Sequence, residues 1–150
     1  MRGYKALNKD MSTLYRNMIY ELNKEYEIER KLIMCENGYH FCKELINVFN
    51  YYPLDSRVFE IDTLDGEIKK DNEFDKYCTN KIKLVREISE DEINKYIEDN
   101  LDILINDENP YVRAAVAKQG YGLDKLINDE YEYVRERART VKQLYEDKEW

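Results

Sequence analysis

The chain has 150 residues, of which 43% are hydrophobic and 13% aromatic, and its net charge is −8. This composition suits one globular domain or two small ones and excludes a disordered chain. No apolar run approaches the roughly 18 residues of a membrane span, and no signal-peptide core follows Met1. We therefore expect a cytoplasmic protein that does not enter membranes. The odd number of cysteines, three, argues against a disulfide framework.

The charge is unevenly distributed along the chain. Residues 1–88 carry 15 Lys and Arg against 16 Asp and Glu, whereas residues 89–150 carry 9 against 16. An acidic second half would repel a phosphate backbone and attract a basic partner. We therefore expect no direct binding of nucleic acid.

Short strands and turns alternate in the first half. Period-two patterns predict strands at residues 4–7, within 18–34, and at 39–42 after the Asn37-Gly38 turn. Apolar residues at helical spacing predict a covering helix over residues 43–52, which ends before Pro53.

Two further strands are predicted at residues 57–64 and 80–88, separated by a charged loop over residues 69–76. Together these elements predict an α+β domain over residues 1–88, a small mixed β-sheet with one covering helix.

An internal repeat dominates the second half. The sequence LDILINDE at 101–108 returns as LDKLINDE at 123–130, and YVR at 111–113 returns at 133–135, always at an offset of 22 residues. Such a period indicates a helical solenoid in which no unit buries its core alone. Ser89 and Glu92 form a capping box that starts a preceding helix. We expect a short all-α domain over 89–150, with repeats at 101–122 and 123–144.

Two resemblances follow from these patterns. The repeats, in which Leu-Asp-x-Leu-Ile-x-Asp precedes Val-Arg, resemble HEAT-like and leucine-rich-variant helical repeats. The first half resembles a phage and prophage domain of unknown function from low-GC Gram-positive bacteria, through its segments 3–8, 20–26, 35–43, 49–52 and 79–88. The second resemblance implies a mobile-element origin and brings no known activity.

A zinc site is the first candidate chemistry, from Cys35, His40, Cys42 and Cys78. Six residues separate Cys35 from Cys42, so the tight knuckle of a typical zinc site is missing. We favour buried cysteines and expect no metal or other cofactor. A nucleophilic pair of His40 and Cys42 is less favoured, because alternate residues of one strand lie too far apart for a direct hydrogen bond.

The strand at Gly38–Phe41, followed by an aromatic-bearing helix, resembles the second motif of ADP-ribosyltransferase folds. This resemblance implies a pocket for NAD or ADP-ribose, formed by Tyr4, Tyr39, His40 and Tyr52. The first-strand His or Arg of that family has no counterpart beyond Arg2 or Lys5, and no Glu stands in a diagnostic context. A pocket without catalysis fits these departures better than a transferase does.

The repeated charges are predicted to be structural. Asp107 with Arg113 and Asp129 with Arg135 should form a ladder between neighbouring repeats. The remaining carboxylates, taken as unpaired, and two tyrosines are the predicted partner-binding residues: Glu98, Asp99, Glu108, Glu130, Glu132, Tyr111 and Tyr133.

The leading hypothesis is a non-enzymatic, phage-encoded module that binds a host protein in the bacterial cytoplasm. An inhibitor of a defence system such as CRISPR fits it, with a basic nucleic-acid-binding effector as partner. The chain lacks a phosphate-binding Gly-rich loop, His-Glu-x-x-His and Gly-x-Ser-x-Gly, which weighs against an enzyme. The nucleotide-binding domain is the alternative, and homo-oligomerisation through the repeat end is a third possibility.

Overall fold

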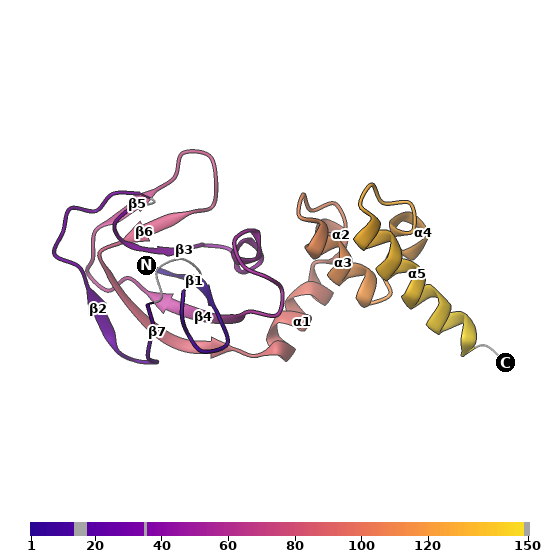
Figure 1. The fold of residues 1–150 in the computed structure, drawn as a ribbon, viewed down its shortest axis with the longest axis horizontal. Coiled ribbons are helices and arrows are strands. Elements are labelled where there is room, and N and C mark those ends of the chain that lie inside the picture. The colour runs from indigo at the N-terminus through magenta and orange to yellow at the C-terminus, as the bar shows by residue number, and fades with distance from the viewer. Residues whose placement is uncertain (14–17, 35, 149–150) are drawn as a thin grey trace. The chain divides into compact units, whose positions relative to one another are not determined.

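The computed structural model describes residues 1–13, 18–34 and 36–148. The chain divides into two compact units, Met1–Ser89 and Glu90–Trp150. The described strands all belong to the first unit, and the second consists of helices and their connections (Figure 1).

A four-stranded antiparallel sheet forms much of the first unit. Its order is β1-β4-β7-β2, and its strands are β1 (Arg2–Leu7), β4 (Arg57–Asp62), β7 (Lys81–Ile88) and β2 (Glu25–Glu27) (Figure 1). In β7 the alternate residues Ile82 and Leu84 are fully buried, as expected of a strand with one face on a core.

A three-stranded antiparallel sheet, in the order β3-β6-β5, completes this unit. Its strands are β3 (Tyr39–Phe41), β6 (Tyr77–Thr79) and β5 (Ile68–Lys70). The predicted loop over residues 69–76 is wrong at its start, because Lys69 and Lys70 belong to β5. Lysines suit an edge strand, where their charges discourage pairing with other chains, so their presence does not exclude a strand.

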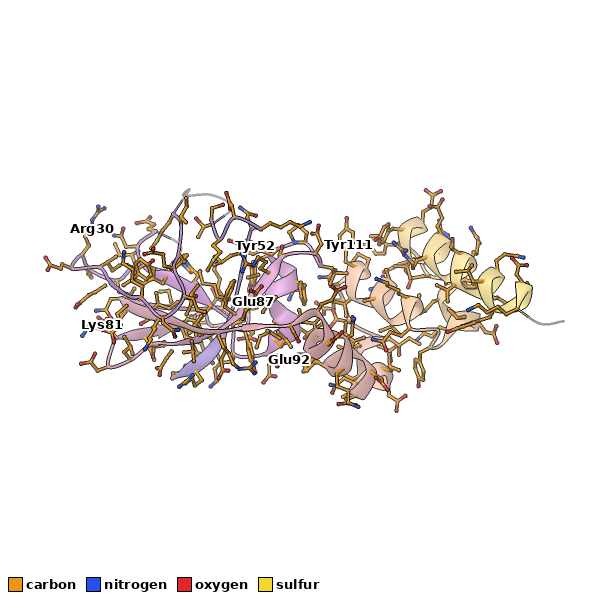
Figure 2. All side chains as sticks on the ribbon, turned by 90° about the horizontal axis from the view of Figure 1, so that it is seen from below. Arg30, Tyr52, Lys81, Glu87, Glu92 and Tyr111 are labelled. Carbon is orange, nitrogen blue, oxygen red and sulfur yellow. The ribbon has the colours of Figure 1, made fainter. Side chains whose placement is uncertain are left out.

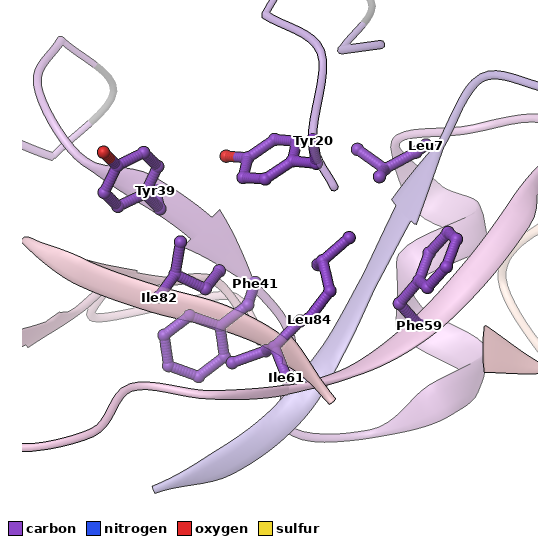
Figure 3. Close-up of a cluster of buried hydrophobic side chains, with 8 residues drawn as sticks. All are labelled: Leu7, Tyr20, Tyr39, Phe41, Phe59, Ile61, Ile82 and Leu84. Carbon is purple, nitrogen blue, oxygen red and sulfur yellow. The ribbon is translucent and has the colours of Figure 1, made fainter. Parts of the chain in front are cut away.

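The core of this unit gathers eight buried side chains from both sheets and from the segment before β2 (Figure 3). They are Leu7, Tyr20, Tyr39, Phe41, Phe59, Ile61, Ile82 and Leu84, none more than 7% exposed. Tyr20 lies outside the named strands, and its ring contacts the ring of Tyr39 at 6.2 Å between centroids. The segment around Tyr20, predicted as a strand, makes isolated bridges at Ile19 and Leu22 and belongs to none of the named strands.

The predicted covering helix is a short 3-10 helix, η1 (Leu45–Asn50). Its buried side chains include Leu45, Val48 and Phe49. The carboxylate of Asp75 accepts hydrogen bonds from the backbone N–H of Lys43 and Glu44, at 2.8 and 2.9 Å, just before the helix begins. Asp75 therefore fixes the chain at the point where the helix begins.

The second unit contains five α-helices in its described residues: α1 (Glu90–Asp99), α2 (Leu101–Leu104), α3 (Pro110–Lys118), α4 (Leu123–Leu126) and α5 (Glu132–Asp147). Helices α2 and α4 start 22 residues apart, as do α3 and α5, so the repeat in sequence is a repeat in structure. Asn109 caps α3 by accepting from Tyr111 N at 2.9 Å, and Pro110 occupies its first turn.

The core of this unit lies between α3 and α5. Val112 and Val116 of α3 and Val134 and Ala138 of α5 are at most 1% exposed. None of the described helices is both long and apolar enough to cross a membrane.

The predicted α+β fold class is confirmed. The β-structure differs in detail from a single mixed sheet. The named strands form two sheets, and each of their pairings is antiparallel. A parallel contact occurs as the isolated bridge between Leu22 and Leu84.

Candidate functional site

A partly open cavity of about 520 Å³ lies within the Met1–Ser89 unit. Small-molecule sites typically have volumes of about 300–1,000 Å³ and combine apolar walls with a few polar groups. Aromatic residues form much of the wall. They are Tyr4, Tyr20, Tyr39, Phe41, Tyr51 and Tyr52. Tyr20 and Tyr39 are buried, whereas Tyr51 is 41% exposed.

The cavity adjoins an opening between β1 and β3. Tyr4 N donates to the Cys42 carbonyl at 2.7 Å, and Cys42 N donates to the Tyr4 carbonyl at 2.8 Å. A regular antiparallel ladder would next pair Ala6 with His40. Instead, the His40 carbonyl accepts a hydrogen bond from Lys5 Nζ at 2.6 Å. The lysine side chain thus takes the place of a strand N–H, and residues 4–6 and 37–42 line the cavity.

Lys5 is the most unusual charged residue of the unit. Lys5 is only 8% exposed, and its Nζ lies 5.6 Å from the centroid of the Tyr20 ring. No carboxylate of the described residues forms an ion pair with it. Burial lowers the pKa of Lys5 from 10.5 to about 8, and the nearby Cys42 offsets part of this effect.

The cavity is cationic although the protein is acidic. Lys5, Arg30 and Lys76 line it, and its described lining includes no Asp or Glu. Arg30 is exposed and makes no ion pair with a residue of the described ranges. Arg30 and Tyr52, which both line the cavity, lie well apart along the unit (Figure 2).

One polar atom of the wall, Thr13 Oγ1, has no partner among the residues that the structure describes. Thr13 Oγ1 is buried and makes no hydrogen bond with the described residues. An unpaired buried hydroxyl costs about 1–3 kcal/mol, so it is a feature that a bound polar group would relieve.

The four residues predicted for a nucleotide pocket, Tyr4, Tyr39, His40 and Tyr52, all line this one cavity. The sequence did not identify Lys5, Thr13, Tyr20 or Arg30 as part of it. A lysine inside the apolar run Tyr-Lys-Ala-Leu was the available signal for the first of these.

The sequence profile of a domain of unknown function, DUF7666, matches residues 1–96. This match spans more than half of the chain. The chain belongs to the DUF7666 family. The residues that line the cavity all lie within the DUF7666 domain, and the resemblance of the first half to a domain of unknown function is confirmed. No curated protein and no solved structure matches the chain.

The cysteines of the DUF7666 domain are not arranged as a metal site in the part of the chain that the structure describes. Cys35, one of the four weighed zinc ligands, lies outside that part. Cys42 and Cys78 are buried, and no group of three or more His, Cys, Asp or Glu among the described residues could hold a metal ion. Burial raises the pKa of Cys42 to about 12, and the nearby Asp75 contributes to this shift. Its thiol is therefore protonated at neutral pH.

Beyond the DUF7666 match, the seven predicted partner-binding residues of the second unit are all exposed. The rings of Tyr111 and Tyr133 lie 5.2 Å apart between centroids, although they are 54% and 46% exposed. The prediction that Asp99 is unpaired is wrong, because Lys95 Nζ donates to its carboxylate at 2.9 Å. These residues lie one helical turn apart, a spacing that brings opposite charges together on a helix surface.

The repeated Arg and Asp residues hold the second unit together. Arg113 Nε and Nη2 donate to the Asp129 carboxylate at 2.8 and 3.1 Å, which joins the two repeats. Arg113 Nη1 donates to the Asp107 carbonyl, and Arg135 Nη1 donates to the Asp129 carbonyl in the same way. Burial raises the pKa of Asp129, but hydrogen bonds from Arg113 and the Tyr131 backbone outweigh it, so that this pKa lies below its ordinary value.

Proposed function

We propose that the DUF7666 domain of this chain binds a small planar anion of the nucleotide class in its cavity. The observation that carries this proposal is the lining, which combines aromatic rings with cations and includes no carboxylate among its described residues. In a chain with a net charge of −8, such a local excess of positive charge favours an anionic ligand.

Each group has a role in this proposal. The rings of Tyr4, Tyr39 and Tyr52 offer faces on which a base or nicotinamide ring stacks, as bases do on aromatic side chains. The guanidinium of Arg30 and the ammonium of Lys76 offer charge-assisted hydrogen bonds to phosphate. NAD, ADP-ribose and mononucleotides share this chemistry. We propose binding without catalysis, and the proposal rests on the cavity rather than on any likeness to a transferase.

Calorimetry and thermal shift with AMP, ADP, ADP-ribose, NAD and uncharged adenosine test the proposal. A ligand at 100 times its dissociation constant adds about 2.7 kcal/mol to the stability of the folded state, which a melting curve detects readily. We expect at least one of the anions to bind and adenosine to bind more weakly than AMP. Failure of every anion, or equal binding of adenosine and AMP, overturns the proposal.

A double variant connects binding to the cavity. Arg30→Ala with Lys76→Ala should weaken the anion by about tenfold or more, since a hydrogen bond to a charged group contributes about 1.5–3 kcal/mol. The matched control is Lys31→Ala with Lys70→Ala. These two exposed lysines lie close in sequence to Arg30 and Lys76, respectively, but do not line the cavity. Equal affinities of the two double variants would assign the anion to another surface.

Exposed side chains of the second unit support a second proposed function, the binding of a basic host protein. The supporting observation is the pair of exposed rings of Tyr111 and Tyr133, which contact each other at a tilt of 59°, since tyrosines of this kind commonly anchor interfaces. Glu108 and Glu130 are equivalent exposed positions of the two repeats, and Glu132 stands beside Tyr133. We propose a HEAT-like repeat surface of a phage-encoded protein that inhibits a host defence effector.

Capture of purified, basic nucleic-acid-binding effectors tests this second function. Binding should weaken as salt is added, because it depends on exposed charge, and Tyr111→Ala with Tyr133→Ala should abolish it. Tyr145→Ala, at another exposed tyrosine, is the control. Capture that survives both high salt and the double substitution contradicts this function.

A further inference from the structure

The amine of Lys5 is a buried nucleophile on the wall of the cavity. Its described partners are the His40 carbonyl, at 2.6 Å, and the face of the Tyr20 ring. An ammonium has three N–H donors, so the described contacts occupy only part of its hydrogen-bonding capacity.

The groups around Lys5 leave it as the reactive side chain of this part of the wall. Burial and the nearby Asp75 raise the pKa of Cys42 to about 12, which keeps its thiol protonated, and burial raises the pKa of Tyr39. Burial has the opposite effect on a base and lowers the pKa of Lys5 to about 8. A desolvated lysine of this kind carries a larger fraction of neutral, nucleophilic amine at neutral pH than an exposed lysine does.

We propose that Lys5 Nζ forms a reversible imine with the carbonyl carbon of a small planar anion that occupies the cavity. This inference rests on the proposed function, and it adds an aldehyde or ketone to the ligand's chemical class. Thr13 Oγ1, which is buried and has no hydrogen-bond partner in the described ranges, belongs to a residue that lines the same cavity, and it offers a hydrogen bond to a carbonyl or carbinolamine oxygen.

The reaction balances without an oxidant or a metal. The lone pair of the neutral amine attacks the carbonyl carbon and forms the N–C bond. The nitrogen then loses its two protons, and the carbonyl oxygen leaves with them as water. Hydrolysis by one water reverses the step and restores the Lys5 amine and the free carbonyl compound.

Two matched probes separate this reaction from simple binding. Pyridoxal 5′-phosphate is a planar aromatic phosphate that carries an aldehyde, and pyridoxine 5′-phosphate has an alcohol at the same position. The full chain is incubated with each probe and then reduced with borohydride, and peptides are mapped by mass spectrometry. We expect both probes to bind, and the aldehyde alone to leave an adduct on Lys5. Lys5 should react at least about tenfold faster than exposed lysines, with Lys31 as the internal comparator.

The Lys5→Arg variant keeps a positive charge and removes the nucleophile. It should still bind pyridoxine 5′-phosphate, which shows that it is folded, and its labelling should fall to that of exposed lysines. Binding of both probes without preferential labelling of Lys5 overturns the imine and leaves the proposed anion site standing. Binding of neither probe counts against the anion site, and labelling that follows exposure alone overturns the imine.

Discussion

Replacing Lys5 by Met removes the buried ammonium and keeps a long apolar side chain in β1. The pKa of Lys5 is about 8 in the folded state, because burial disfavours its charged form, against 10.5 for an ordinary lysine. Below pH 8 both the folded and the unfolded states are protonated, and the folded state bears the full cost of the buried charge. Above pH 8 the folded state releases its proton first, so wild-type stability rises with pH relative to that of the variant.

The size of this effect follows from the two pKa values. Between pH 7 and pH 9, proton linkage gives the wild type about 1.3 kcal/mol of stability that Lys5→Met does not gain. The other titrating groups near the cavity, among them Cys42 and Tyr39, are present in both proteins and largely cancel in the comparison. The quantity compared is the change in the free energy of unfolding from pH 7 to pH 9 in the wild type, minus the same change in Lys5→Met. It does not depend on the absolute stability of either protein.

Urea unfolding at pH 7 and pH 9 measures the four free energies of unfolding. The near-ultraviolet circular dichroism of the buried tyrosines reports on the Met1–Ser89 unit, whose core contains Tyr20 and Tyr39. Lys31→Met is the control at an exposed lysine, and it should show no such pH dependence. If wild type and Lys5→Met differ by the same free energy at both pH values, the Lys5 amine is not desolvated, and the reasoning about its reactivity is refuted.

Three further substitutions test the packing. Arg113→Ala leaves the Asp129 carboxylate unpaired in a largely buried site and should cost about 3–5 kcal/mol, measured by helical circular dichroism during urea unfolding; a loss below about 1 kcal/mol would place the pair with exposed ion pairs. Gly38→Ala should cost about 2 kcal/mol, because Gly38 has φ +128° and an added Cβ would lie 2.5 Å from Leu32 Cδ1; unchanged stability would contradict this strain. Leu126→Ala should cost about 2–5 kcal/mol at a site 1% exposed, whereas Leu144→Ala, at 55%, should cost little; equal losses would contradict the described core.

The helical unit was predictable because its signals are local. Asn109 and Pro110 mark the start of α3 within two adjacent residues, and the 22-residue offset then places α4 and α5. The sheets were harder to predict because their contacts are distant in sequence. Tyr20 is buried through packing on β3, and β5 pairs with β6 although two of its three residues are lysines. No local pattern encodes these partners.

The candidate site shows the same division. The resemblance of the strand at Gly38–Phe41 predicted Tyr4, Tyr39, His40 and Tyr52 as pocket residues, and in the structure all four line one cavity. Lys5 was considered only as a counterpart of another family's residue. Its role depends on the isolated bridge between Tyr4 of β1 and Cys42 after β3, beyond which Lys5 bonds the His40 carbonyl, and that arrangement depends on the whole fold.

The Arg113–Asp129 pair also bears on how such a chain can grow. In each repeat an arginine donates to the backbone carbonyl of the aspartate in the turn before it, Arg113 to Asp107 and Arg135 to Asp129. Arg113 also donates to the carboxylate of Asp129 in the next repeat. The arginine donor and the aspartate acceptor both recur every 22 residues. A duplicated segment of that length would therefore carry both the arginine and the aspartate of a new ion pair between repeats. Duplication of the coding segment would therefore lengthen this unit by one 22-residue repeat at a time while it keeps the existing Arg–Asp contacts.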